Sequence, residues 1–137
     1  MMLVIDASVV IKWFIEEKDS AKALLLKDNH INSKTILIAP DLLIYEVANV
    51  LLFSKIFTPL EIKGCLQDLY ELEIDLINPS IDFVLSAIEL AFSKQISIYD
   101  ASYLALAKEL DTKLITADKK LYTSANEPNH IELLSDI

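Results

Sequence analysis

The chain has 137 residues, the size of one ordinary domain, and 53% of them are hydrophobic, which supplies one core and excludes an intrinsically disordered protein. Twelve lysines and no arginine stand against 21 acidic residues, so the net charge is −9. A protein that holds nucleic acid through a broadly basic surface is therefore excluded. Two interpretations remain: nucleic acid is not the ligand, or bound cations neutralise part of the acidity and hold phosphate themselves.

The N-terminal part begins with a short apolar strand at residues 2–5, which ends at Asp6. A helix is expected at 9–17, with Ser8 as its N-cap because a serine side chain can accept a hydrogen bond from the first turn of a helix. A second helix is expected from about residue 19 or 20 to residue 28. No basic segment precedes the first strand, so we expect no signal peptide.

The middle of the chain continues the alternation of strands and helices. A β-branched strand is expected at 35–39, followed by a long helix at 40–55 whose first turn suits Pro40. A helix at 58–72 and a short strand at 74–77 come next.

The C-terminal part is expected to contain helices at 80–94 and 97–110, a strand at 113–116, a short helix after Asp118, and a strand at 131–134. Strands that alternate with helices of 10–15 residues are typical of a parallel sheet. The sequence therefore predicts an α/β fold in one domain that spans residues 1–137.

The chain lacks several features that would indicate other compartments or ligands. No apolar stretch approaches the roughly 20 residues of a membrane span, so we expect no membrane association. Cys65 is the only cysteine and cannot form an internal disulfide, which indicates a reducing, cytoplasmic location. Gly64 is the only glycine, which excludes glycine-rich nucleotide-binding loops.

Two carboxylates follow expected strands. Asp6 comes directly after the strand at 2–5, and Asp118 comes two residues after the strand at 113–116. Ligands of open α/β sheets bind outside the carboxyl ends of the strands, and parallel neighbours lie roughly 4.8 Å apart. The two side chains therefore converge if these strands are neighbours. Each is also open to a simpler interpretation as a turn residue or a helix cap.

Two further carboxylates lie on expected helices. Glu46 lies beside an apolar stripe that includes Leu43, where a buried charge is costly unless it finds a cation; a position at the edge of the stripe facing water stays open. Asn49 lies on the same side of that helix and is placed to support Glu46. Asp100 fits a capping box with Ser97, a role that is compatible with a second one as a ligand.

Carboxylates that meet in one place repel each other unless cations intervene. Oxygen ligands without a cysteine and histidine cluster favour Mg²⁺ or Mn²⁺ over zinc, and His30 and His130 are isolated, as expected of surface or capping residues. Two such ions, about 3.5–4 Å apart, would activate water and stabilise the oxygens of a phosphodiester. The sequence therefore predicts a hydrolytic two-metal site.

Four motifs in this order resemble those of the PIN-domain nucleases, and most closely the VapC-type toxins of prokaryotic toxin–antitoxin pairs. They cover residues 4–14 (VIDASVVIKWF), 40–51 (PDLLIYEVANVL), 99–107 (YDASYLALA) and 114–121 (LITADKKL). The resemblance implies a three-layer α/β/α PIN-like fold with a central, mostly parallel sheet. It also implies Mg²⁺- or Mn²⁺-dependent endoribonuclease activity, in which the catalytic metal ligands are the acidic tetrad Asp6, Glu46, Asp100 and Asp118.

The resemblance has further implications for the surroundings of the acidic tetrad. Ser8 and Thr116 match small hydroxyl residues that order ligands or water beside it. Family members commonly form homodimers and are inhibited by a small VapB-type antitoxin that covers the site. Lys12, Lys119 and Lys120 are candidates for contacts to flanking RNA phosphates, against the simpler interpretation of ordinary solvated lysines.

Two other functions remain open. A phosphoryl-transfer or signalling domain could use Asp6 as an acceptor, but it needs a second acidic residue or a strand-end lysine nearby, and it leaves Glu46 unexplained. A non-catalytic PIN-like module that binds RNA or a protein would use its acidic surface for a basic partner. Such a module would shift the mobility of RNA without producing fragments.

Overall fold

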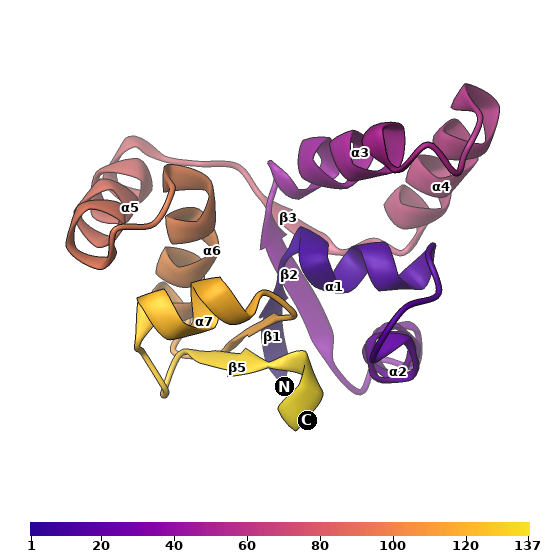
Figure 1. Cartoon of the computed structure of the whole chain (residues 1–137). Coiled ribbons are helices and arrows are strands. Elements are labelled where there is room, and N and C mark those ends of the chain that lie inside the picture. Colours follow the sequence, from indigo (N-terminus) through magenta and orange to yellow (C-terminus); the bar gives the residue numbers. More distant parts are fainter.

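The computed structural model describes all 137 residues, and its centre is a five-stranded sheet in which every neighbouring pair of strands is parallel (Figure 1). The strands are β1 (Met2–Ile5), β2 (Ile36–Pro40), β3 (Asp75–Ile77), β4 (Leu114–Thr116) and β5 (Ile131–Leu133). Their order across the sheet is β3-β2-β1-β4-β5. The expected α/β fold is confirmed, and the sheet is parallel throughout.

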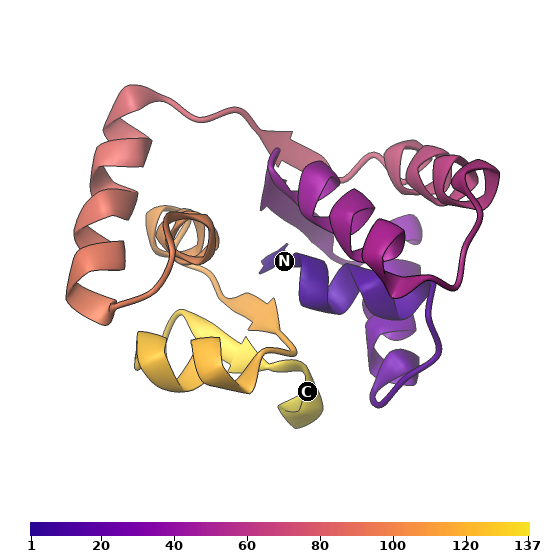
Figure 2. The same cartoon turned by 45° about the horizontal axis from the view of Figure 1, so that its top comes forward.

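Helices cover both faces of the sheet and complete three layers (Figures 1 and 2). One face carries α1 (Ala7–Val10), the 3₁₀ helix η1 (Ile11–Trp13), α2 (Ser20–Ile31), α3 (Leu43–Ser54) and α4 (Pro59–Glu71). The other face carries α5 (Ile81–Lys94), α6 (Ile98–Glu109) and α7 (Lys119–Ala125), and a 3₁₀ helix, η2 (Leu134–Asp136), ends the chain. The α/β/α arrangement expected from the resemblance is therefore confirmed.

The central strands are apolar on both sides because helices cover both faces of the sheet. Val4 and Ile5 in β1 and Leu114 in β4 have no exposed side-chain surface. On the neighbouring helix α6, Leu104 is equally buried. The two central strands and α6 therefore share one apolar core.

The order of the strands reverses at β1. From β1 the chain runs outward to β2 and β3, and then returns to β4 and β5 on the other side of β1. As a result β1 and β4 are neighbours, with Ile5 paired to Ile115. The condition for the convergence of Asp6 and Asp118 is met, and a reversal of this kind opens a crevice at the carboxyl ends of the strands.

The helix expected at 9–17 is wrong in length and in its cap. It is replaced by α1 and η1, which end at Trp13. The indole N–H of Trp13 donates to the carbonyl of Ala23, at 2.8 Å, and this contact with α2 outweighs the local preference for a longer helix. The N-cap of α1 is Asp6 and not Ser8, because the Asp6 carboxylate accepts the Ser8 N–H at 3.1 Å.

The helix expected to begin at Pro40 begins later. Pro40 is the last residue of β2, and α3 begins at Leu43. The pairing of β2 with β1 ends at Ile38, so the missing N–H of Pro40 costs no hydrogen bond to that neighbour. The other elements lie within a few residues of their expected ranges, and none of the helices combines the length and apolar character that crossing a membrane requires.

Candidate functional site

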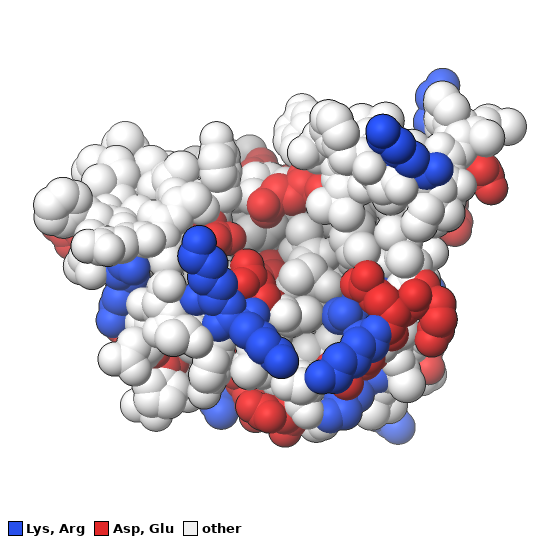
Figure 3. All heavy atoms as spheres, in the orientation of Figure 1, with Lys and Arg blue, Asp and Glu red and all other residues white.

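The acidic tetrad is brought to one edge of the sheet by four different elements. Asp6 follows β1, and Asp118 precedes α7 just beyond β4. Glu46 lies in the first turn of α3, and Asp100 lies in the first turn of α6. Figure 3 shows acidic atoms inside a hollow in the middle of this face, with lysine side chains along its lower rim.

Asp6 is the most enclosed member, with 6% of its surface exposed. Its Oδ1 accepts the Ser8 hydroxyl at 2.5 Å, and its Oδ2 accepts the Thr116 hydroxyl at 2.5 Å. In turn, Ser8 Oγ accepts the Ala117 N–H at 2.8 Å, and Thr116 Oγ1 accepts the Asp118 N–H at 3.1 Å. The two hydroxyl residues singled out in the sequence thus tie the ends of β1 and β4 together around the Asp6 carboxylate.

The environment of Asp6 disfavours its negative charge. Burial raises the pKa of Asp6 from 3.8 to about 6, and the charge of Asp100 acts in the same direction. The hydrogen bonds from Ser8 and Thr116 lower this pKa but do not offset burial. At neutral pH the carboxylate is therefore ionised at a cost, which a bound cation would remove.

Glu46 has a partner that the sequence did not reveal. The hydroxyl of Tyr103, a residue of α6 with 1% of its surface exposed, donates to Glu46 Oε1 at 2.6 Å. Burial raises the pKa of Glu46, against this hydrogen bond, which lowers it. Asn49, which was expected to support Glu46, is exposed and forms no hydrogen bond with it. The support comes instead from the opposite helical layer.

The capping role considered for Asp118 is part of the structure, and the capping box considered at Asp100 is half formed, because the Asp100 carboxylate accepts no hydrogen bond from the Ser97 N–H. Ser97 caps α6 by accepting the Asp100 N–H at 3.0 Å. Asp118 caps α7, because its Oδ1 accepts the Leu121 N–H at 3.0 Å. Its Oδ2 accepts no hydrogen bond and faces solvent with the rest of this exposed residue. A capping role and a ligand role are therefore compatible at this position.

The members of the acidic tetrad influence one another electrostatically. After burial, which is the largest cause, the charge of Asp118 raises the pKa of Asp100, and the charge of Asp100 raises that of Glu46. No lysine pairs with any of the four, since all four salt bridges of the protein involve other residues. None of the four carboxylates therefore has an ion-pair partner in the protein.

The chemistry of these donors fits hard divalent cations. All four side chains offer carboxylate oxygens, the ligands that Mg²⁺ and Mn²⁺ prefer. His30 and His130 bond to the main-chain oxygens of Leu72 and Thr112, so neither joins the cluster. No three acidic, histidine or cysteine side chains lie close enough to form a closed cation site.

The three lysines singled out in the sequence have different surroundings. Lys12 is largely buried, and its ammonium group bonds to the Lys18 carbonyl at 2.7 Å and to Glu17 Oε1 at 3.2 Å. Lys119 and Lys120 are exposed at the start of α7 and form no salt bridge. Lys12, Lys18 and Lys119 line a small cavity of about 90 Å³. Positive charge therefore does lie beside the acidic cleft.

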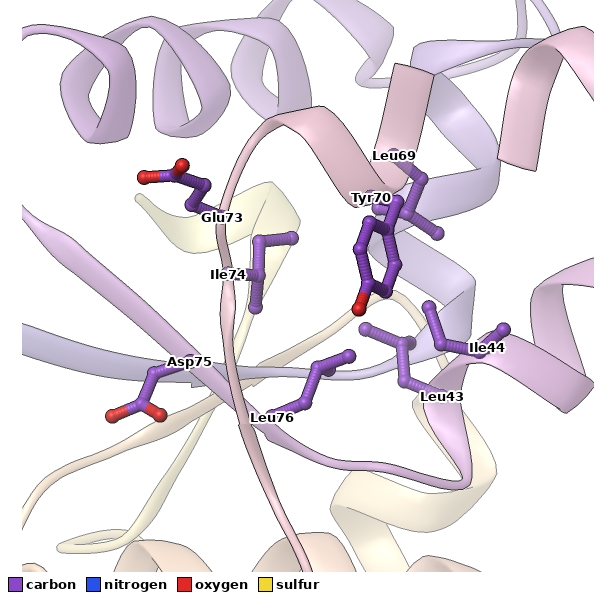
Figure 4. A pocket seen from close by; sticks show the side chains of 8 residues that line it. All are labelled: Leu43, Ile44, Leu69, Tyr70, Glu73, Ile74, Asp75 and Leu76. Atoms are coloured by element: carbon purple, nitrogen blue, oxygen red, sulfur yellow. The ribbon is translucent and has the colours of Figure 1, made fainter. Parts of the chain in front are cut away.

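A mainly apolar cavity lies away from the acidic tetrad. It has a volume of about 400 Å³ between α3, the end of α4 and β3, and none of the acidic tetrad lines it (Figure 4). Its walls are mainly apolar and include Leu69, Ile74 and Leu76. The carboxylate chemistry therefore belongs to the open cleft and not to this cavity.

Comparison with known proteins agrees with this architecture. The family model of the PIN domain matches residues 3–126. The chain belongs to the PIN domain family. It is 30% identical to Ribonuclease VapC3 of Pyrobaculum aerophilum over 125 residues, which cover 88% of this chain and 92% of that protein.

Two solved structures share the PIN fold with this chain. The crystal structure of PAE2754 from Pyrobaculum aerophilum superposes with a TM-score of 0.70 at 21% identity, covering 99% of this chain and 85% of the other. The second structure is VapBC2 from Rickettsia felis bound to a DNA fragment from its promoter. It matches with a TM-score of 0.67 at 17% identity, covering 97% and 98% of the two chains.

Proposed function

We propose that this PIN domain is a metal-dependent endoribonuclease that hydrolyses RNA phosphodiester bonds, and that it is the toxin of a VapBC-type toxin–antitoxin pair. The observation that carries the proposal is the cleft of four carboxylates at the strand-order reversal, which no lysine neutralises. The 30% identity to a protein named as a VapC ribonuclease supports RNA as the substrate. An RNA substrate also suits a cytoplasmic protein.

Each member of the acidic tetrad has a proposed role. Asp6 and Asp100 would be the principal ligands, Asp118 would complete one metal site, and Glu46 would hold a second metal or orient water. Two Mg²⁺ or Mn²⁺ ions, when bound, would activate water and stabilise the charge that develops at the phosphodiester. The Ser8 and Thr116 hydroxyls hold the Asp6 carboxylate in one orientation, so it need not reorganise during the reaction.

The direct test is incubation of the purified protein with total RNA in Mn²⁺, in Mg²⁺ and in EDTA, followed by sequencing of the cut ends. We expect fragments with 5′-phosphate and 3′-hydroxyl ends in the presence of either ion and none in EDTA, because the proposed reaction depends on a divalent ion to activate water. Restoring Mn²⁺ to the EDTA-treated protein should restore cleavage. RNA that is retarded in a gel but never cut in any buffer would instead identify a non-catalytic binding module.

We also propose that the lysines beside the cleft hold RNA phosphates that flank the cut. Each phosphate contact on single-stranded RNA contributes about 0.7 to the slope of log K against log salt concentration. Because the slope is negative, replacing Lys119 and Lys120 together by alanine should reduce its magnitude by about 1.4, measured by fluorescence anisotropy in EDTA. Lys12→Ala should also weaken RNA binding more than Mn²⁺ binding.

The matched control is Lys63→Ala, an exposed lysine on α4. Its salt slope should equal that of the parent protein. If the double variant and this control bind RNA alike at every salt concentration, the lysines beside the cleft are ordinary solvated side chains.

The proposed partners are a VapB-type antitoxin and a second copy of the chain. The antitoxin is supported by the relative named VapC3 and by the VapBC2 structure, which shares the fold. Self-association is supported by an apolar ridge on α5 that is at least half exposed. The ridge consists of Ile81, Leu85, Ile88 and Phe92. Contiguous exposed apolar surface of this kind is typical of protein interfaces.

A further inference from the structure

Tyr103 joins the two helical layers through a hydrogen bond to a member of the acidic tetrad. It belongs to α6, on one face of the sheet, and its hydroxyl reaches Glu46 of α3, on the other face (Figure 1). It lies three residues after Asp100, so both side chains project from the same side of α6. The tyrosine is 1% exposed and packs within the main apolar core.

The Tyr103 hydroxyl is a polar group at an otherwise apolar core position. An apolar core position is satisfied by phenylalanine, and a buried tyrosine hydroxyl usually has a specific partner. Here the single partner is Glu46 Oε1, at 2.6 Å. A hydrogen bond to a carboxylate is stronger than one between neutral groups. The only hydrogen bond of the hydroxyl is therefore to one side chain of the acidic tetrad.

We propose that Tyr103 positions Glu46 for cation binding: its hydroxyl occupies Oε1 and leaves Oε2 as the single oxygen that Glu46 presents to the cleft. A glutamate side chain has three rotatable bonds, and the Glu46 carboxylate accepts no other hydrogen bond. Without Tyr103 the carboxylate would sample several orientations, and a cation would have to order it. This inference rests on the proposed function, because it assumes that the acidic tetrad binds a divalent cation.

The test compares Mn²⁺ affinity, measured by isothermal titration calorimetry, in the parent protein, Tyr103→Phe, Glu46→Gln and the double variant. Tyr103→Phe keeps the ring in the core and removes only the hydroxyl. We expect it to weaken Mn²⁺ binding roughly tenfold, the scale seen when a group that orients a metal ligand is lost. In the Glu46→Gln background the same change should have no further effect.

The control variant is Tyr70→Phe, which removes the hydroxyl of an exposed tyrosine on α4 and should leave the affinity unchanged. Thermal unfolding of each metal-free variant separates altered positioning from a damaged fold. The parent protein and Tyr103→Phe differ only by the tyrosine hydroxyl, so a loss of Mn²⁺ affinity in a variant that still folds is caused by the loss of that hydroxyl.

The outcomes separate this inference from the proposed function. If the parent protein binds no Mn²⁺, both are overturned. If the parent binds Mn²⁺ and Tyr103→Phe binds it equally well or more tightly, only the positioning role is overturned, and a tighter complex would mean that Tyr103 holds Glu46 back. A loss of affinity that persists in the Glu46→Gln background would overturn it too, because Tyr103 would then act through another group.

Discussion

Replacing Asp6 by asparagine should lower the rate of RNA cleavage by about a hundred-fold to a thousand-fold at saturating Mn²⁺. Losses on this scale follow when one essential electrostatic contact to a reacting centre is removed. Asp6 is the member that the surrounding structure holds most firmly, with three hydrogen bonds from Ser8 and Thr116. Asparagine has the same shape but no charge, so the fold should survive while a proposed cation ligand is lost.

The measurement is a cleavage time course on a labelled RNA, with circular dichroism to check the fold. Asp100→Asn should behave like Asp6→Asn, because Asp100 is the charge that acts on both Asp6 and Glu46. The matched control is Asp68→Asn, an exposed aspartate of α4 that should retain full activity. Full activity in Asp6→Asn would refute the assignment of Asp6 as a catalytic ligand.

The strands of the sheet were predicted from the sequence more accurately than the ends of the helices that follow β1 and β2. Strands such as 113–116 are short apolar runs bounded by turn residues, a pattern that local sequence carries by itself. The prediction of a helix at 9–17 failed because the helix ends where Trp13 donates to a main-chain carbonyl of α2. Such a long-range contact cannot be recognised from the local sequence. The prediction of a helix start at Pro40 failed because proline, which suits the first turn of a helix, is also compatible with the end of β2, beyond the residues paired with β1.

The same division applies to the candidate site. Asp6 and Asp118 could be found because each follows an apolar strand, and their convergence required only that β1 and β4 be neighbours. Tyr103 could not be found, because it lies in an apolar stretch of α6 and reads as an ordinary core residue. The only signal in the sequence was a tyrosine hydroxyl on a helix face expected to be buried. Its hydrogen-bond partner cannot be identified until the relative positions of α3 and α6 are known.

The same Asp6→Asn variant should be more stable than the parent protein when no metal is present. The pKa of Asp6 is about 6 in the folded protein against an ordinary value of 3.8. The folded state therefore holds this proton more tightly than the unfolded chain does, so the free energy of unfolding falls as pH rises from 3.8 to 6 and stays lower above it. At 1.36 kcal/mol per pKa unit, the ionised carboxylate costs about 3 kcal/mol.

This expectation can be checked by urea unfolding in EDTA at pH 4 and pH 7.5. Asp6→Asn removes the buried charge and exchanges one accepted hydrogen bond for a donated one, so we expect a net gain of about 2 kcal/mol at pH 7.5 and little difference near pH 4. Mn²⁺ should stabilise the parent protein at pH 7.5 but not the variant. A parent protein that is the more stable of the two in EDTA at pH 7.5 would mean that the hydrogen bonds from Ser8 and Thr116 outweigh burial. The cleft would then hold its charge without strain, and the electrostatic reason for expecting a cation there would disappear.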